Sequence, residues 1–197
     1  MTVLVDYGAG NLTSVRNAFA ALGVETSVAR DPAAVAAADR VVFPGVGAAG
    51  SAMANLASAG LVEAVRSAAL SGRPFLGICL GMQVLFSHSE EDGGVDCLGV
   101  FGGKVRRFPD AAGFKVPEIG WNMVEGNGEP GTGNGEFYFV HSYYAEIVPE
   151  TAGVTEYAGV RFTAMARRGR LWACQFHPEK SGRIGLDFIR DWLSTST

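Results

Sequence analysis

Cys79 stands where a nucleophile would sit at a sharp turn from a strand into a helix. It follows the apolar run 74–78, and glycine stands two positions before it and two positions after it. Such a turn requires glycine because larger side chains would collide with the neighbouring strands and helix. N–H groups at a helix start favour a thiolate, and the Leu80 N–H is left free to donate to an oxyanion. The pattern indicates attack by sulfur on a carbonyl carbon, although a small buried structural cysteine is the alternative.

A second candidate for chemistry lies far downstream, where His177 and Glu179 flank a proline. The chain has three histidines, and this one directly follows the strand-like run 171–176. Residues two apart in an extended segment point the same way, so the imidazole and the carboxylate are expected to share a face. Glu179 can then accept from one ring nitrogen while the other takes the proton of Cys79. A solvated surface turn is the alternative for this segment alone; with Cys79 in the same chain, the segment predicts a Cys-His-Glu triad.

The glycine-rich segment 45–50 has the letters of a dinucleotide-binding fingerprint but not its context. It follows the third expected strand, and the next strand ends in Cys79 instead of an acidic residue for a ribose. We interpret residues 45–47 as a tight loop that approaches a ligand beside the thiol and supplies a second N–H to an oxyanion. His141 ends a strand-like run and could line the pocket, whereas His88 lies in an acidic loop and is expected to be exposed.

Composition predicts one compact domain over residues 1–197. Of these residues 48% are hydrophobic and 18% are charged, and the net charge of -4 gives no bias toward nucleic acid. We find no signal peptide and no apolar run of membrane-spanning length. The three cysteines are widely spaced and odd in number, which argues against a disulfide scaffold and a Cys-rich zinc site. We therefore expect a cytoplasmic protein without metal, cofactor, nucleic acid or membrane partner.

The elements that must position these groups alternate in the first half of the chain. Strands are expected at 3–6, 24–29, 40–43 and 74–78, and helices at 11–22, after Asp31, at 61–70 and at 80–86. This order implies a parallel sheet wrapped by helices, with the site at the carboxyl ends of its strands. Residues 87–94 read as a polar loop. Short strand-like runs then follow, separated by turns such as 126–135, and predict an added antiparallel portion before a closing helix at 183–193.

Together these residues resemble the class I (triad) glutamine amidotransferases. Residues 77–83 and 176–179 are similar to the family's nucleophile and His-Pro-Glu motifs, and the resemblance covers nearly the whole chain. The other stretches that carry it are 6–12, 44–48, 119–122, 137–143 and 179–181. The resemblance implies a three-layer flavodoxin-like α/β fold, with a mainly parallel sheet and an added antiparallel portion. It also implies hydrolysis of L-glutamine to glutamate and ammonia through a thioester on Cys79.

The same resemblance assigns further residues. It places oxyanion and substrate binding at Gly45, Val46, Gly47, Leu80, Gln83, Ser142 and Tyr143. It implies that the ammonia passes to a separate (β/α)8-barrel cyclase subunit in a heterodimer. The candidates for the partner-facing rim, each of which could equally be packing, are Asn11, Trp121, Asn122, Tyr138 and Lys180. Two positions depart from the family: Glu118 stands where histidine is common, and Ala49 where an aromatic residue is frequent.

Two other functions compete with this interpretation. A stand-alone hydrolase or peptidase could share the cysteine turn, but it would lack the combined Gly-Trp-Asn, Phe-Val-His-Ser-Tyr and His-Pro-Glu-Lys-Ser stretches. A non-catalytic binding subunit could keep the fold, but drift would be expected to remove Cys79, His177 or Glu179 first. Replacing Cys79 with alanine separates the classes, because a binding role survives that change and amide hydrolysis does not.

Overall fold

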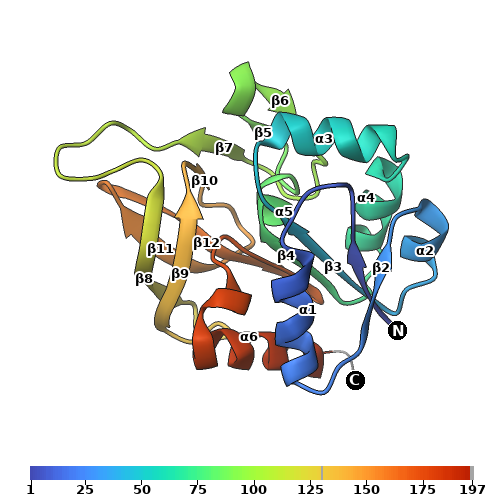
Figure 1. The fold of residues 1–197 in the computed structure, drawn as a ribbon. Coiled ribbons are helices and arrows are strands. Elements are labelled where there is room, and N and C mark those ends of the chain that lie inside the picture. The colour runs from blue at the N-terminus through green and yellow to red at the C-terminus, as the bar shows by residue number, and fades with distance from the viewer. Residues whose placement is uncertain (130, 196–197) are drawn as a thin grey trace.

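The centre of the sheet is parallel and largely buried. The computed structural model describes residues 1–129 and 131–195. The strands run in the order β2-β1-β3-β4-β13, and each neighbouring pair is parallel (Figure 1). In that order they span Thr26–Ala29, Thr2–Val5, Arg40–Gly45, Phe75–Cys79 and Leu171–Cys174. Strands β1, β4 and β13 are buried along their whole length, which explains their continuous apolar sequence.

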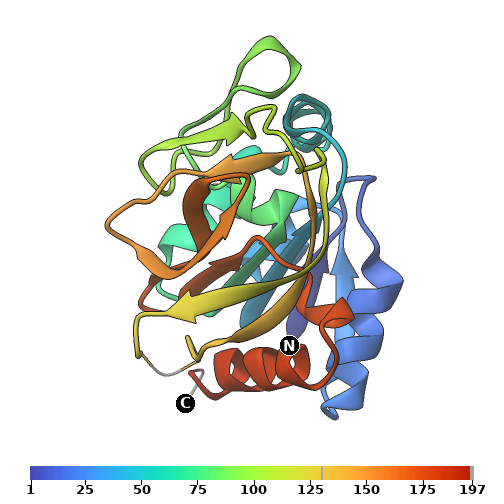
Figure 2. The same cartoon turned by 90° about the vertical axis from the view of Figure 1, so that its left-hand side faces the viewer.

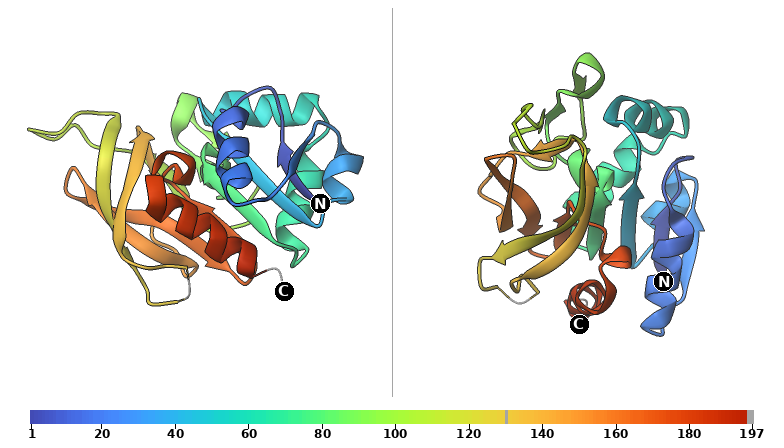
Figure 3. Two further views of the ribbon diagram at one scale, coloured as in Figure 1. Left: turned by 60° about the horizontal axis from the view of Figure 1, so that its bottom comes forward. Right: turned by 60° about the vertical axis from the view of Figure 1, so that its left-hand side comes forward.

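Helices cover both faces of this parallel centre. They are α1 (Leu12–Ala21), α2 (Pro32–Ala36), α3 (Ala49–Ser58), α4 (Val62–Leu70), α5 (Leu80–Gln83) and α6 (Gly182–Ser194). Alternate side chains of a strand face opposite ways, so Val3 packs with α3 and α4 while Leu4 packs with α1 and α6. The rings of Phe19 and Trp192 join α1 to α6, with centroids 6.0 Å apart. Figure 3 shows these two helices near each other in both views. None of the described helices has the length and apolarity needed to cross a membrane.

Antiparallel strands extend the sheet beyond β13. They follow in the order β12 (Val160–Arg168), β10 (Tyr143–Ala145), β7 (Lys104–Arg107), β5 (His88–Ser89) and β6 (Val95–Asp96). Within this series only β5 and β7 pair in parallel. A branch leads from β12 through β11 (Thr151–Tyr157) to β8 (Glu118–Gly126) and β9 (Gly135–His141), and Figure 2 shows these strands to one side of the parallel centre. The α/β fold class expected from the sequence is confirmed.

Two helices differ from the sequence expectation. Helix α3 was not expected, because the glycines around its start and an N-cap alanine without a side-chain cap give no helix signal. Its small buried face, which includes Ala52 and Leu56, packs on the sheet.

Helix α5 ends at Gln83 instead of continuing to residue 86. The N–H groups of Leu85 and Phe86 donate to the carbonyls of Met82 and Gln83, three residues back, so the helix tightens into a turn there. Residues 98–101 hold this turn, because their N–H groups donate to the carbonyls of residues 84–86 at 2.8–3.0 Å.

The segment after α5 is also more ordered than a polar loop. It contains strand β5 and the 3-10 turn η1 (Glu91–Gly93). Within it, His88 is half-buried, not exposed as expected, because its Nδ1 lies 3.0 Å from Asp96 Oδ1 across the β5–β6 pair.

The last strand is shorter than expected: β13 ends at Cys174 instead of Phe176. The N–H of Gln175 still bonds the Ala164 carbonyl at 2.9 Å, but the chain then turns toward the site.

Candidate active site

Cys79 sits on a strained turn that glycines make possible. It is the last residue of β4, is 6% exposed and has φ 53° and ψ -112°, a conformation that is rare for a residue other than glycine. A Cβ at Gly81 would lie 1.8 Å from the Phe43 carbonyl oxygen, and one at Gly77 would lie 3.0 Å from the Gly81 carbonyl oxygen. The glycines therefore let α5 pack directly on β3 and hold the thiol at the carboxyl end of β4.

His177 and Glu179 form the hydrogen-bonded pair that their spacing suggested. His177 Nδ1 lies 2.8 Å from Glu179 Oε1, and the two side chains are 3% and 2% exposed. The segment is not extended as expected, because Pro178–Lys180 forms the 3-10 turn η2. Ser181 fixes this turn: its hydroxyl donates to the His177 carbonyl at 2.7 Å and accepts the Tyr138 N–H at 3.0 Å. The turn follows β13, the strand next to β4, and so brings the pair to the side of Cys79.

The surroundings of His177 favour its protonated form. Burial by itself lowers the pKa of the imidazole, but hydrogen bonds and charge interactions with Cys79 and Glu179 outweigh burial and raise the pKa to about 10. His177 therefore holds its proton at pH 7 and can act as an acid beside the sulfur.

The two cysteines outside the cavity are in surroundings that disfavour a thiolate. Burial raises the pKa of Cys97 to about 11 and raises the pKa of Cys174 well above its ordinary value. These two groups stay neutral and unreactive.

The raised pKa of His177 predicts a specific titration. The ring of His177 should stay protonated through neutral pH and lose its proton only as the pH rises through about 10. A Cys79→Ala variant should lower that pKa, because the hydrogen bond and charge interaction with the thiol are lost. Ring nitrogen NMR can follow this, since the chain has three histidines and a His88→Gln variant helps to assign them. A His177 ring that titrates near 6.5 in the parent protein would contradict this account.

One cavity of about 330 Å³ brings together most of the residues singled out from the sequence. Cys79 and His177 line it, together with Val46, Gly47, Leu80, Gln83, Ser142 and Tyr143. Gly45 does not line the cavity, but it is the register partner of Cys79 in the β3–β4 ladder, so the loop after β3 starts beside the thiol. The volume suits a small-molecule ligand. Among residues 1–129 and 131–195, no group of histidine, cysteine and acidic side chains is arranged to hold a metal ion.

Glu91 also lines this cavity, and the sequence offered no sign of it. It lies in an acidic run that reads as solvated loop. In the structure η1 folds against the start of α3, and Glu91 Oε2 accepts the Ala49 N–H at 2.7 Å. Burial is the main cause that raises the pKa of this carboxyl. The contact ties the loop after β3 to the cavity wall.

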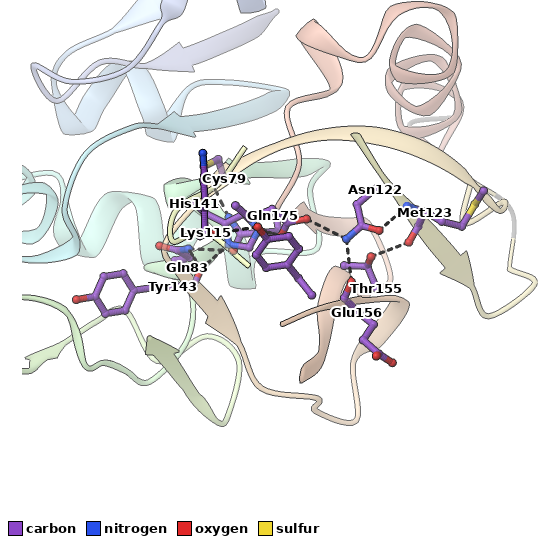
Figure 4. A network of polar contacts seen from close by, with 12 residues as sticks. Cys79, Gln83, Lys115, Asn122, Met123, His141, Tyr143, Thr155, Glu156 and Gln175 are labelled. Carbon is purple, nitrogen blue, oxygen red and sulfur yellow. Dashed lines mark hydrogen bonds and ion pairs between the residues drawn. The ribbon is translucent and has the colours of Figure 1, made fainter. Parts of the chain in front are cut away.

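His141 also lines the cavity and is paired with the buried Glu118 carboxyl. His141 Nδ1 lies 2.7 Å from the Tyr143 carbonyl oxygen, and its Nε2 lies 3.1 Å from Glu118 Oε2. Both side chains are 3% exposed. Because a carbonyl only accepts, the proton of the contact with Tyr143 lies on Nδ1. Glu118, the departure from the family noted above, is therefore the partner of a wall histidine. Asn122 donates to the second carboxyl oxygen of Glu118 at 2.9 Å. It also donates to the Glu156 carbonyl at 2.9 Å, and Figure 4 shows these two residues side by side.

The residues expected at a partner-facing rim lie in different settings. Trp121, Tyr138 and Lys180 come together: the two aromatic centroids are 6.2 Å apart, and the Lys180 ammonium is 5.8 Å from the Tyr138 ring centroid. We call these residues the Trp121 cluster. Asn122 does not join it, because its side chain bonds Glu118 and the Glu156 carbonyl. Asn11 caps α1, accepting the Ser14 N–H at 3.2 Å.

This chain belongs to the class-I glutamine amidotransferase family, whose model matches residues 3–193. The fold agrees: a solved glutamine amidotransferase superposes with a TM-score of 0.77 at 20% identity over 98% of both chains. A structure of PurLQS from Thermotoga maritima gives 0.72 at 17% identity, covering 98% of this chain and 97% of that one.

Its curated relatives are more specific. The imidazole glycerol phosphate synthase subunit HisH of Symbiobacterium thermophilum is 49% identical, with 96% of this chain and 92% of that protein covered. The subunit of the same name from Methanothermobacter thermautotrophicus is 46% identical over 98% of both chains. Similarity at this level extends along nearly the whole molecule.

Proposed function

We propose that this chain is the glutaminase subunit of an imidazole glycerol phosphate synthase. It hydrolyses glutamine to glutamate and ammonia in the cytoplasm, as a single domain and without a cofactor. The ammonia passes to a (β/α)8-barrel cyclase subunit, which makes imidazole glycerol phosphate and aminoimidazole carboxamide ribonucleotide in histidine biosynthesis. The observation that carries the proposal is the arrangement of Cys79 and the His177–Glu179 pair around one cavity.

The first half of the reaction forms a thioester. The Cys79 sulfur attacks the side-chain amide carbon of glutamine, and the carbonyl oxygen becomes an oxyanion. The N–H groups near Val46 and Leu80, both at the cavity, stabilise that charge. Protonated His177 gives its proton to the amide nitrogen, the C–N bond breaks, and ammonia leaves. Glu179 holds the imidazole in orientation through Nδ1.

The second half restores the thiolate. Neutral His177 now accepts a proton from water, and the hydroxide attacks the thioester carbon. A second oxyanion forms at the same N–H groups, and its collapse breaks the C–S bond. Glutamic acid leaves and gives its own proton to solvent, while His177 keeps the proton from water. The histidine thus returns to the protonated state that its raised pKa favours at neutral pH.

The Trp121 cluster supports a partner on the side of the molecule next to η2. Trp121 is 55% exposed, and Ile119 and Met123, two residues to either side along β8, are 64% and 49% exposed. An exposed apolar row of this kind is typical of a protein interface. Lys180 directly follows Glu179, so a cyclase bound here would contact the turn that carries part of the triad. Asn11 and Asn122 belong to the proposed rim with less support, because both amides are used within the chain.

Glutamate release from glutamine tests the proposal. We expect release by the purified chain to rise sharply when the cyclase subunit of an imidazole glycerol phosphate synthase and its ribonucleotide ligand are both present. The cyclase with ligand but without this chain is the control. Fast release that ignores the cyclase would leave the cysteine chemistry standing and contradict the assignment to this synthase. A folded chain that releases no glutamate under any condition would contradict the glutaminase itself.

A further inference from the structure

Gln175 is a buried polar residue beside the nucleophile that the mechanism above leaves without a role. It directly follows β13 and is 0% exposed. A buried amide must satisfy both its N–H groups and its oxygen inside the protein, because leaving them unpaired costs free energy. Its contacts therefore indicate what the residue does.

The side chain of Gln175 lies between the nucleophile and the cavity wall. Its Nε2 lies 3.7 Å from Cys79 Sγ, within the range of a hydrogen bond to sulfur, and its Oε1 accepts from Gln83 Nε2 at 2.9 Å. Gln83 Nε2 also donates to the Tyr143 carbonyl at 2.8 Å. Figure 4 shows Cys79, Gln83, Tyr143 and Gln175 together, with His141 beside them; its Nδ1 lies 2.7 Å from the same Tyr143 carbonyl oxygen.

The orientation of both amides follows from this arrangement. The Tyr143 carbonyl can only accept, so Gln83 must turn its NH2 group toward it. The remaining N–H of Gln83 then points at Gln175, which must offer its oxygen there. The amide nitrogen of Gln175 is thereby left facing the sulfur. A glutamine turned the other way would place two oxygens or two NH2 groups against each other.

An N–H group in this position favours charge on sulfur. A thiolate is a stronger hydrogen-bond acceptor than a thioester sulfur, and bonds to a charged acceptor are stronger than neutral ones. The contact is therefore strongest before attack and again when the thioester breaks, which is when sulfur carries the charge. Gln175 itself is fully buried, so water does not compete for its N–H group.

The contact between Gln175 Oε1 and Gln83 Nε2 determines which atom of Gln83 can face the substrate in the cavity. Both N–H groups of Gln83 are used by Tyr143 and Gln175, so Oε1 is the polar atom of Gln83 that remains for a ligand. An oxygen there recognises an N–H donor of the substrate. Gln175 thus connects the orientation of the substrate-contacting amide to the placement of the nucleophile.

We propose that Gln175 is a further catalytic residue of this site: its amide N–H donates to the Cys79 sulfur, and its carbonyl oxygen fixes Gln83 as an acceptor toward substrate. This rests on the proposed glutaminase function. The contact with sulfur is nevertheless measurable without turnover, by the pH dependence of Cys79 alkylation.

The test compares variants by iodoacetamide labelling, with mass spectrometry of the peptide that contains Cys79. Gln175→Met keeps the length of the side chain and removes its donor, so we expect the midpoint of the labelling curve to move up by about one pH unit. Gln175→Asn, which keeps an amide but withdraws it from sulfur, should move the midpoint in the same direction. Gln83→Met removes the partner that orients Gln175 but leaves the Gln175 amide in place, so it should move the midpoint by less than Gln175→Met while raising KM for glutamine. Thermal unfolding checks that each variant is folded.

Two results would overturn the proposal. One is a labelling midpoint that is unchanged in folded Gln175→Met or Gln175→Asn. The other is a larger movement in Gln83→Met than in Gln175→Met, which would mean that loosening of the cavity, and not the donor at sulfur, is responsible. If the parent chain releases no glutamate with any partner, the proposed function fails, but the labelling comparison still decides whether Gln175 donates to Cys79.

Discussion

Alanine in place of Cys79 is expected to lower glutamate release by at least about 10³-fold, because no other group at the cavity can form the thioester. Alanine fits the same turn, and its loss of volume is small, so the variant should fold and still bind glutamine. Glutamate release with the cyclase and its ligand present measures the first effect, and calorimetry with glutamine measures the second.

A matched control exists in the same chain. Cys97 is half-buried, does not line the cavity, and has a thiol whose pKa burial raises to about 11. Cys97→Ala should therefore retain glutamate release. Residual activity within tenfold of the parent in Cys79→Ala would show that the sulfur is not the nucleophile. A protein that only binds glutamine would be indifferent to both changes.

Gly81→Ala is expected to destabilise the fold by roughly 3–5 kcal/mol, an unusually large effect for one methyl group. The added Cβ would lie 1.8 Å from the Phe43 carbonyl oxygen, and neither the backbone of β3 nor the start of α5 can move away without breaking the turn at Cys79. Urea unfolding gives the change in the free energy of unfolding. Any protein that does fold should have low activity, because the turn sets the direction of the thiol.

Gly102→Ala is the control for this prediction. Gly102 is exposed, and a Cβ there meets nothing within 4 Å. Its substitution should change the free energy of unfolding by less than about 0.5 kcal/mol. If the two variants are equally stable, then the close packing of α5 on β3 does not hold the turn, and the strained conformation of Cys79 has another origin.

The residues and strands that could be predicted from the sequence are those marked by a pattern of neighbouring residues. The glycines two residues from Cys79 report a tight turn. His177 and Glu179 pair as predicted, but through the 3-10 turn η2 and not through the extended segment on which the prediction rested. Strands β1, β4 and β13 were recognisable because burial on both faces makes them continuously apolar. These features depend on neighbours along the chain and can be read from it.

The groups that were missed depend on distant contacts. Glu91 reads as part of a solvated acidic run until η1 folds against α3 and gives it the Ala49 N–H. Gln175 reads as the end of a strand until Gln83 and Cys79, each far away in sequence, come to either side of it. The turn that ends helix α5 is held by the N–H groups of residues 98–101, which no pattern within residues 80–86 reveals. No local pattern carries this information, because each case is decided by which segments meet in three dimensions.

The neighbouring order of β3, β4 and β13 has an evolutionary consequence. The loop after β3, the thiol at the end of β4 and the histidine after β13 all emerge from adjacent strand ends, and Gly45 and Cys79 share one rung of the ladder. The bond-breaking apparatus is therefore a self-contained module of the parallel centre. Ser142, Tyr143, Trp121 and Tyr138 belong to the antiparallel part. Under the proposed function, a lineage can rebuild that outer part, and with it part of the proposed substrate site and of the proposed partner surface, while inheriting the attack on the amide unchanged.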